Sequence, residues 1–190
     1  TEADQTRAEA LATLLGHKFQ DEFKSTQSPF DYLIQHHKIT PLQLNAISQD
    51  AERRGRSIGS LLIADANVSQ VDIAASLEAY YQVPFMGYQA GLQLPADLMR
   101  EVVPQRLKQQ VWVPVAGSVE EAVILIDNPS DHTRILEIQA CLPNVKNFVL
   151  RVGLKEDIVR IIDNGLRTLA DKVDLLTLIN ALPRKTSTPA

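Results

Sequence analysis

Apolar residues recur at helical spacing through the first half of the chain, most clearly in residues 56–82. A short apolar turn is predicted there, followed by a break at Ala66–Asn67 and then by a second helix. Ser69 and Asp72 are typical of a helix start, because the hydroxyl accepts an unpaired backbone N–H and the carboxylate faces the positive end of the helix dipole. The stretch therefore predicts a helix-turn-helix unit.

The same pattern occurs earlier in the chain. Leu33 aligns with Leu62 at a separation of 29 residues (62 − 33 = 29). In this first copy Thr40 is the predicted cap, Pro41 the first helical residue and Gln43 the reciprocal capping partner. Two helix starts in register within one apolar pattern predict a duplicated supersecondary element.

After Gln82 the period of the apolar pattern changes. β-branched runs around a glycine turn predict a hairpin, and Asn128-Pro129-Ser130-Asp131 predicts a helix start. Gly165 is a candidate stop or kink in the last helix. The expected elements are an edge strand at 83–86, helices at 94–103 and 104–110, strands at 111–115 and 122–126, a helix that starts at 128–131 and is ended by Pro143, a strand at 145–152 and a helix at 155–164.

These patterns predict an α+β fold, in which a helical half built from a duplicated helix-turn-helix unit precedes a small β-β-α-β-α half. The expected organisation is an N-terminal helix or linker over residues 1–28, and one domain over residues 29–164. Within that domain the helical half covers 29–82 and the α+β half covers 83–164. Residues 165–190 are expected to form a C-terminal helix and a disordered tail.

The composition limits the classes of protein to which this chain can belong. The 190 residues are 45% hydrophobic and 22% charged, which is ordinary for one globular domain. No apolar run approaches the roughly 18 residues that span a bilayer, so no direct membrane insertion is expected. The net charge of −4 argues against a partner that is a nucleic-acid polymer. A single cysteine, Cys141, excludes a disulfide within the chain.

Catalytic and metal-binding patterns are weak. The sequence contains no GxxxxGK[ST] phosphate loop, so the chain is not expected to hydrolyse ATP by itself. His36-His37 has no carboxylate or cysteine at metal-ligand spacing, so no metal site is expected. Asp127, Asp131 and His132 could suggest acid–base chemistry, but helix capping explains them more economically. We therefore predict no catalytic residues, no cofactor and no enzyme activity in this chain.

The succession of segments resembles a known family. The segments are IGSLLIADANVSQVDIAASLEAYYQVPF, LPADLMREVVPQRLKQQVWVPVAGSVEEAVILIDNPSD and NFVLRVGLKEDIVRIID. This order is similar to the N-terminal (MshE N-terminal-type) domain of type II secretion and type IV pilus assembly ATPases, over about residues 30–163. The family includes members that bind cyclic di-GMP.

The resemblance implies a ligand-binding pattern that begins Arg-Leu-Gly and continues with paired apolar residues, a second glycine, spaced leucines and a glutamine. In the second copy, Ser57 replaces the arginine, Ala66 the second glycine, Asn67 an apolar residue and Tyr80 the glutamine. In the first copy, Phe30 and His37 stand at the two glycines and the arginine is missing. The candidate cyclic di-GMP residues are Arg56, Ile58, Gly59, Leu62, Ile63, Val68, Ile73 and Leu77.

Two of these candidates have an equally simple structural explanation. Arg56, with Arg53 and Arg54, could replace the missing arginine one residue out of register, or could be a solvated helix end. Gly59 could admit a ligand, or could allow close helix packing.

The resemblance implies a non-catalytic regulatory and docking domain that couples a partner protein or cyclic di-GMP to the motor. The implied partners are the inner-membrane platform protein of a secretion or pilus machine and the ATPase core. The implied location is cytoplasmic, peripheral at the inner membrane through these partners. The alternative is a cyclic di-GMP sensor domain attached to another effector, such as a membrane glycosyltransferase.

Overall fold

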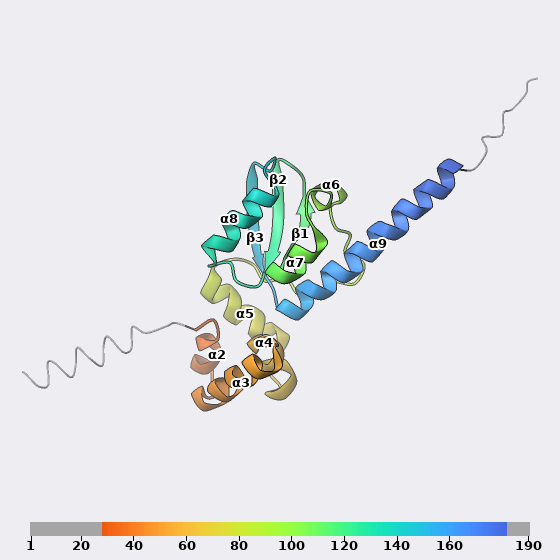
Figure 1. Cartoon of the computed structure of the whole chain (residues 1–190). Helices are drawn as coiled ribbons and strands as arrows, with labels where there is room; N and C mark the ends of the chain where they lie inside the picture. The colour runs from red at the N-terminus through yellow and green to blue at the C-terminus, as the bar shows by residue number, and fades with distance from the viewer. Residues whose placement is uncertain (1–27, 182–190) are drawn as a thin grey trace, which may run out of the picture.

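The structure is a computed structural model that describes residues 28–181, with side chains described through residue 171. The helical half and the α+β half lie side by side, and the last helix extends away from both (Figure 1). The expected α+β class is confirmed. The predicted helix at 1–24 and the tail after 182 lie outside the described residues. The elements are α2 (Asp31–Gln35), α3 (Pro41–Arg54), α4 (Ile58–Asp65), α5 (Gln70–Tyr81), α6 (Ala96–Met99), α7 (Pro104–Gln110), β1 (Trp112–Gly117), β2 (Glu121–Ile126), α8 (His132–Cys141), β3 (Asn147–Val152) and α9 (Lys155–Ala181).

The duplicated unit is present, with its copies in the predicted register. Helix α3 begins at Pro41 and α5 at Gln70, which are 29 residues apart (70 − 41 = 29). Thr40 forms the complete capping box at the start of α3. Ser69 caps α5 by accepting from the backbone N–H of Asp72, while its hydroxyl donates to the Asp72 carboxylate. Helix α2 packs against α5 and α3 against α4, so the two copies pair with each other.

The turn inside each unit contains one residue in the left-handed conformation. In the first copy this residue is His37, with φ of 55°. In the second copy it is Asn67, with φ of 56°, and not Ala66, which the resemblance aligned with a glycine. Asparagine adopts positive φ more readily than most residues, so the turn forms without glycine.

The α+β half is built on a three-stranded sheet in the order β1-β2-β3. Strands β1 and β2 form the predicted antiparallel hairpin, with an irregularity between Pro114 and Ala116. Strand β1 continues to Gly117, so the turn begins at Ser118, later than the predicted centre. Strand β3 runs parallel to β2, and α8 makes the crossover between them.

Two predicted elements are shorter than expected. The helix predicted at 94–103 is confined to α6, because Val103 takes the extended conformation that a following proline favours. The edge strand predicted at 83–86 is a single parallel bridge between Phe85 and Val152. Pro84 accepts a hydrogen bond from Val152 but has no N–H to donate, which limits the pairing.

Helix α9 does not stop at Gly165, as the sequence suggested it could. The glycine serves close packing instead, because a Cβ at this position would clash with the side chain of Leu94. The last part of α9 extends beyond the body (Figure 1). Within residues 28–181, no helix is both long enough and apolar enough to cross a membrane.

The described residues form two apolar cores. The first surrounds the sheet and belongs to the α+β half, with Trp112 and the β2 residues Ile124, Leu125 and Ile126 fully buried. The second lies among α2–α5 and also contains Val152 and Leu154 from the end of β3 and the residues after it. The helical half therefore completes its core with side chains from the α+β half.

Candidate functional site

A cleft of about 270 Å³ lies where the two halves meet. The start of α4, the end of α5, the residues after β2 and the connection from β3 to α9 form its walls. Its lining mixes apolar and polar groups from both halves. The lining residues are Ser28, Pro29, Phe30, Ser57, Ile58, Gly59, Leu77, Tyr81, Asp127, Asn128, Gly153, Leu154 and Lys155.

The start of α4 is tied to the start of α9 at one side of this cleft. Ser57 accepts a hydrogen bond from the backbone N–H of Ser60 and so caps α4. Glu156 accepts from the backbone N–H of Ser57 at 2.8 Å and from the Ser57 hydroxyl at 2.5 Å. Burial pushes the pKa of Glu156 upward, but the hydrogen bonds from Ser57 and the nearby Arg56 outweigh it, so the pKa lies below its ordinary value. The carboxylate is therefore charged at neutral pH.

Gly59 lies where α4 touches the connection between β3 and α9. A Cβ at this position would lie 2.6 Å from Cδ2 of Leu154 and 3.5 Å from Cγ2 of Ile73. The contact with Leu154 is closer than side chains tolerate, so a glycine is needed for α4 to pack here. Close packing therefore accounts for Gly59 in this structure, although the residue also borders the cleft.

The predicted binding residues lie in three places, namely the cleft, a neighbouring groove and the helical core. Ile58, Gly59 and Leu77 line the cleft, and Arg56 lies outside it, beside Lys155 in a neighbouring groove. Arg56 donates to the Ser60 hydroxyl and lies 4.0 Å from Glu156.

The remaining predicted residues belong to the helical core and do not line the cleft. Leu62 and Ile73 have no exposed surface and Val68 is 5% exposed, while Ile63 is partly buried against the same core. In this structure they pack in the helical core and do not border the cleft.

Arg134 and two carboxylates form an ion-pair network behind the cleft. The guanidinium lies 2.5 Å from Asp127 and 3.2 Å from Asp131, and it also donates to the backbone carbonyl of Gln110. Burial raises the pKa of Asp127, and Arg134 opposes that shift. Asp131 caps α8, as the sequence predicted, by accepting from the backbone N–H of Arg134. The network holds α7, β2 and α8 together, which favours the capping explanation over acid–base chemistry.

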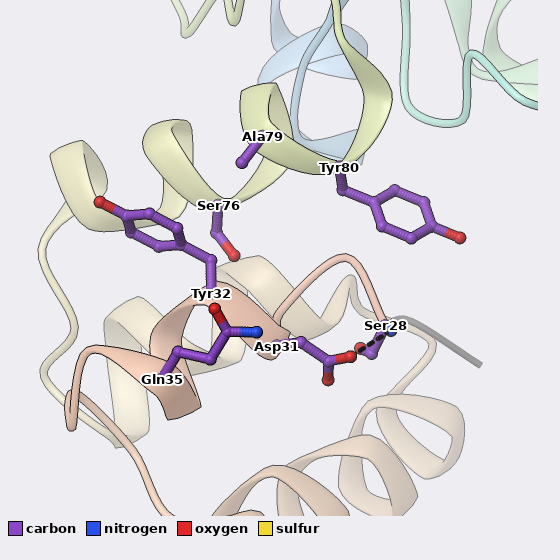
Figure 2. Close-up of a pocket in the computed structure, with 7 residues that line it drawn as sticks. All are labelled: Ser28, Asp31, Tyr32, Gln35, Ser76, Ala79 and Tyr80. Carbon is purple, nitrogen blue, oxygen red and sulfur yellow. Dashed lines mark hydrogen bonds between the residues drawn. The ribbon is translucent and has the colours of Figure 1, made fainter. Parts of the chain in front are cut away.

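The adjacent tyrosines at the end of α5 face two different hollows. Tyr81 lines the cleft, and burial, with the nearby Tyr80 and Asp127, raises its pKa to about 12. Its hydroxyl therefore remains protonated at neutral pH. Tyr80 is 39% exposed and lines a smaller hollow between α2 and α5. Figure 2 shows this second hollow, with Ser76 of α5 close to Tyr32 of α2 and the Tyr80 ring on the other side of Ser76, pointing away from Tyr32.

His36 and His37 have structural positions. His36 packs on Tyr32 with ring centroids 4.1 Å apart, and His37 is the left-handed turn residue. The described residues contain no group of three or more His, Cys, Asp or Glu side chains that could hold a metal ion.

Sequence reasoning missed Glu156 and Lys155 as site residues. Glu156 is 99 residues from Ser57, and Lys155 is 100 residues from Gly55, to whose carbonyl it donates. No local pattern links positions so far apart, since the contact exists only because β3 delivers the start of α9 to the start of α4. The acidic first turn of α9 was visible in the sequence, but it indicates only a helix start.

Comparisons with known proteins agree on the fold. No protein-family model matches the sequence, and no curated protein matches it either. A structure of MshE with cdg is similar with a TM-score of 0.55 and 16% identity, covering 74% of this chain and 99% of that chain. The N-terminal domain of XpsE is similar with a TM-score of 0.51 and 21% identity, covering 72% of this chain and 92% of that chain.

The chain therefore has the fold of the XpsE N-terminal domain and of the compared MshE chain, and the resemblance inferred from the sequence is confirmed at the level of the fold. The similarity extends over almost the whole length of both compared structures, the XpsE N-terminal domain and MshE.

Proposed function

We propose that this chain is a non-catalytic regulatory and docking domain of a bacterial type II secretion or type IV pilus assembly ATPase. The observation that carries the proposal is the fold, which matches 92% of the XpsE N-terminal domain and 99% of the MshE chain. The 190 residues contain no GxxxxGK[ST] loop, which fits a domain that regulates a motor elsewhere in the protein.

A protein partner is favoured over cyclic di-GMP as the species that this domain couples to the motor. Ser57 stands where the family pattern has an arginine, and its donors are already engaged by Glu156. An arginine at this place would offer several fixed donors to a phosphate or a guanine, whereas the serine offers one hydroxyl. The polar recognition of a dinucleotide is thus largely missing on this side of the cleft.

The shared core suggests how docking is transmitted. Val152 and Leu154 lie at the end of β3 and before α9, yet they pack within the core of the helical half. A partner that displaces α2–α5 would therefore disturb the start of α9, because packed cores transmit strain. In this proposal the partner is the cytoplasmic domain of an inner-membrane platform protein, and the ATPase core receives the displacement. The domain would then act on the cytoplasmic side, at the inner membrane through its partners.

A binding experiment tests the proposal. We expect saturable, micromolar or tighter binding of the platform protein's cytoplasmic domain to the 190-residue chain, measured by biolayer interferometry. We also expect that domain to change the ATPase rate of the parent protein, and the change to disappear when residues 1–190 are deleted. The proposal fails if the platform domain does not bind, or if the deletion leaves its effect on the rate intact.

A second candidate is a cyclic di-GMP sensor attached to another effector, such as a membrane glycosyltransferase. The similarity to the structure of MshE with cdg favours it, together with a cleft that Tyr81, Asp127 and Asn128 supply with polar groups. The parent gene distinguishes the two candidates. A phosphate loop downstream of Ala190 supports the motor, and transmembrane helices encoded beside the domain support the effector.

A further inference from the structure

Leu154 and the first two residues of α9 contact the end of α3 and the start of α4. Leu154 packs on Gly59, Lys155 donates to the carbonyl of Gly55 at 3.2 Å, and Glu156 accepts from Ser57. Residues 154–156, which we call the 154–156 clamp, thus join the α+β half to the helical half over a single short segment.

The two charges of the clamp match the two helix ends that they meet. Helix α3 ends at the C-cap Gly55, where the dipole is negative, and Lys155 brings its ammonium group to the Gly55 carbonyl. Helix α4 begins after the N-cap Ser57, where the dipole is positive, and Glu156 brings its carboxylate there. Each charge lies at the helix end that stabilises it.

The carboxylate of Glu156 also occupies the position that an anionic ligand would take. The start of a helix attracts anions, and two donors of Ser57 already point at Glu156. Arg56, the nearest cation of the helical half, lies 4.0 Å from the same carboxylate. A phosphate at this place would have to displace Glu156 and would meet its negative charge.

We propose that Glu156 is a built-in anion that fastens the helical half to the α+β half without a ligand and excludes phosphate-bearing ligands from the start of α4. The proposal goes beyond the proposed function, because it concerns how the halves are joined and holds whichever protein binds. It makes Glu156 the residue that keeps phosphate from Ser57, which lines this side of the cleft.

The first test compares two neighbouring carboxylates in the chain without any ligand. Glu156→Ala removes the contact with Ser57, and Asp157→Ala removes an equally placed first-turn charge of α9 that has no such contact. Amide hydrogen exchange, followed by NMR, should become about tenfold faster at Ser57 and Ser60 in Glu156→Ala. It should stay unchanged at these amides in Asp157→Ala, and unchanged in β2 in both variants.

Equal exchange at Ser57 in the two variants overturns the proposal. If Glu156→Ala does not fold, Glu156→Gln takes its place, since it keeps the side-chain length and an acceptor while removing the charge. The Gln variant should show a smaller increase in exchange at the same two amides, and an unchanged rate there also overturns the proposal.

The second test probes the exclusion of anions with inorganic pyrophosphate and with cyclic di-GMP. We expect the Ser57 and Ser60 amide resonances to shift with either anion in Glu156→Ala, and to stay in place in the wild type and in Asp157→Ala. Shifts with pyrophosphate alone still support the exclusion of phosphate by Glu156. Equal shifts in the wild type and in Glu156→Ala, or none in either, contradict it. Platform-protein binding is measured separately, so failure here is distinct from failure of the proposed function.

Discussion

The two halves of the molecule differ in how their cores are closed. The α+β half surrounds its sheet with its own residues, among them Trp112, Ile124 and Ile158, which are fully buried. The helical half has a smaller core that is completed by Val152 and Leu154 of the other half. The helical half is therefore the dependent one, and its position is fixed by the part of the chain that leads into α9. That dependence fits the coupling role proposed above.

The largest loss of stability is expected from a cavity in the core of the α+β half, which is closed by that half's own residues. Ile124→Ala should lower the free energy of unfolding by about 3–4 kcal/mol, because the side chain is fully buried in the central strand. Urea unfolding should show this both by fluorescence of Trp112, the only tryptophan, and by circular dichroism, which reports on both halves. Val149→Ala, at a position 38% exposed on β3, should cost less than about 1 kcal/mol. A similar loss in both variants would contradict this description of the core.

The next largest loss of stability is expected from a substitution at the contact between the halves. Gly59→Ala should cost about 1–3 kcal/mol, because its Cβ would meet Leu154, and this outweighs the helix propensity of alanine. In a Leu154→Ala background the same change should be nearly neutral or stabilising. The double-mutant cycle is measured by urea unfolding. Equal costs of Gly59→Ala in the two backgrounds would show that the glycine does not serve this contact.

A smaller loss of stability is expected from removing the helix cap in each copy of the helical unit. Thr40→Ala and Ser69→Ala should each cost about 1 kcal/mol, with Thr40 the larger because it forms the complete capping box. Thermal unfolding by circular dichroism measures both, with Thr133→Ala on the surface of α8 as the control. A loss as large in Thr133→Ala would show that the capping bonds are not the cause.

The smallest effect is the pH dependence contributed by Glu156. Its pKa is lowered in the folded chain from an ordinary value of 4.5, mainly because the hydrogen bonds from Ser57 outweigh burial, which raises it. The folded state thus binds this proton less readily than the unfolded state, and the stabilisation is fully present above pH 4.5. It should disappear as the pH falls through the lowered pKa.

The wild type should accordingly exceed Glu156→Gln in stability at neutral pH, with the gap closing in acid. Urea unfolding at a series of pH values measures this difference. A gap that is constant down to acid pH, or that widens there, would contradict the assigned direction of the pKa shift.

Local signals in the sequence were sufficient for the helix starts and the hairpin. Thr40, Ser69 and Asp131 cap their helices as predicted, because a cap is decided by residues three positions apart. Gly165 was misinterpreted as a candidate stop, since the side chain that requires it, Leu94, lies 71 residues earlier (165 − 94 = 71). Local pattern cannot distinguish a glycine that ends a helix from one that lets a neighbour approach.

The candidate site was predictable only in part, for the same physical reason. Ile58, Gly59 and Leu77, which the family's binding pattern singled out, line the cleft, and their contact with a ligand stays a prediction. Other apolar residues of that pattern, such as Leu62, are buried in the core. The spacing of apolar residues along a helix does not show which of them border a cleft. Glu156 could not be found, because its partner is set by the packing of two halves.

The central claim is the proposal that, in a chain with the fold of the compared MshE structure, the Glu156 carboxylate takes the place of an anionic ligand at the start of α4. Calorimetric titration of the 190-residue chain with cyclic di-GMP tests it most directly. We expect no saturable heat at ligand and protein concentrations that would reveal micromolar binding. Saturable binding of one dinucleotide per chain, weakened by Arg56→Ala, would contradict the claim and would make the domain a sensor.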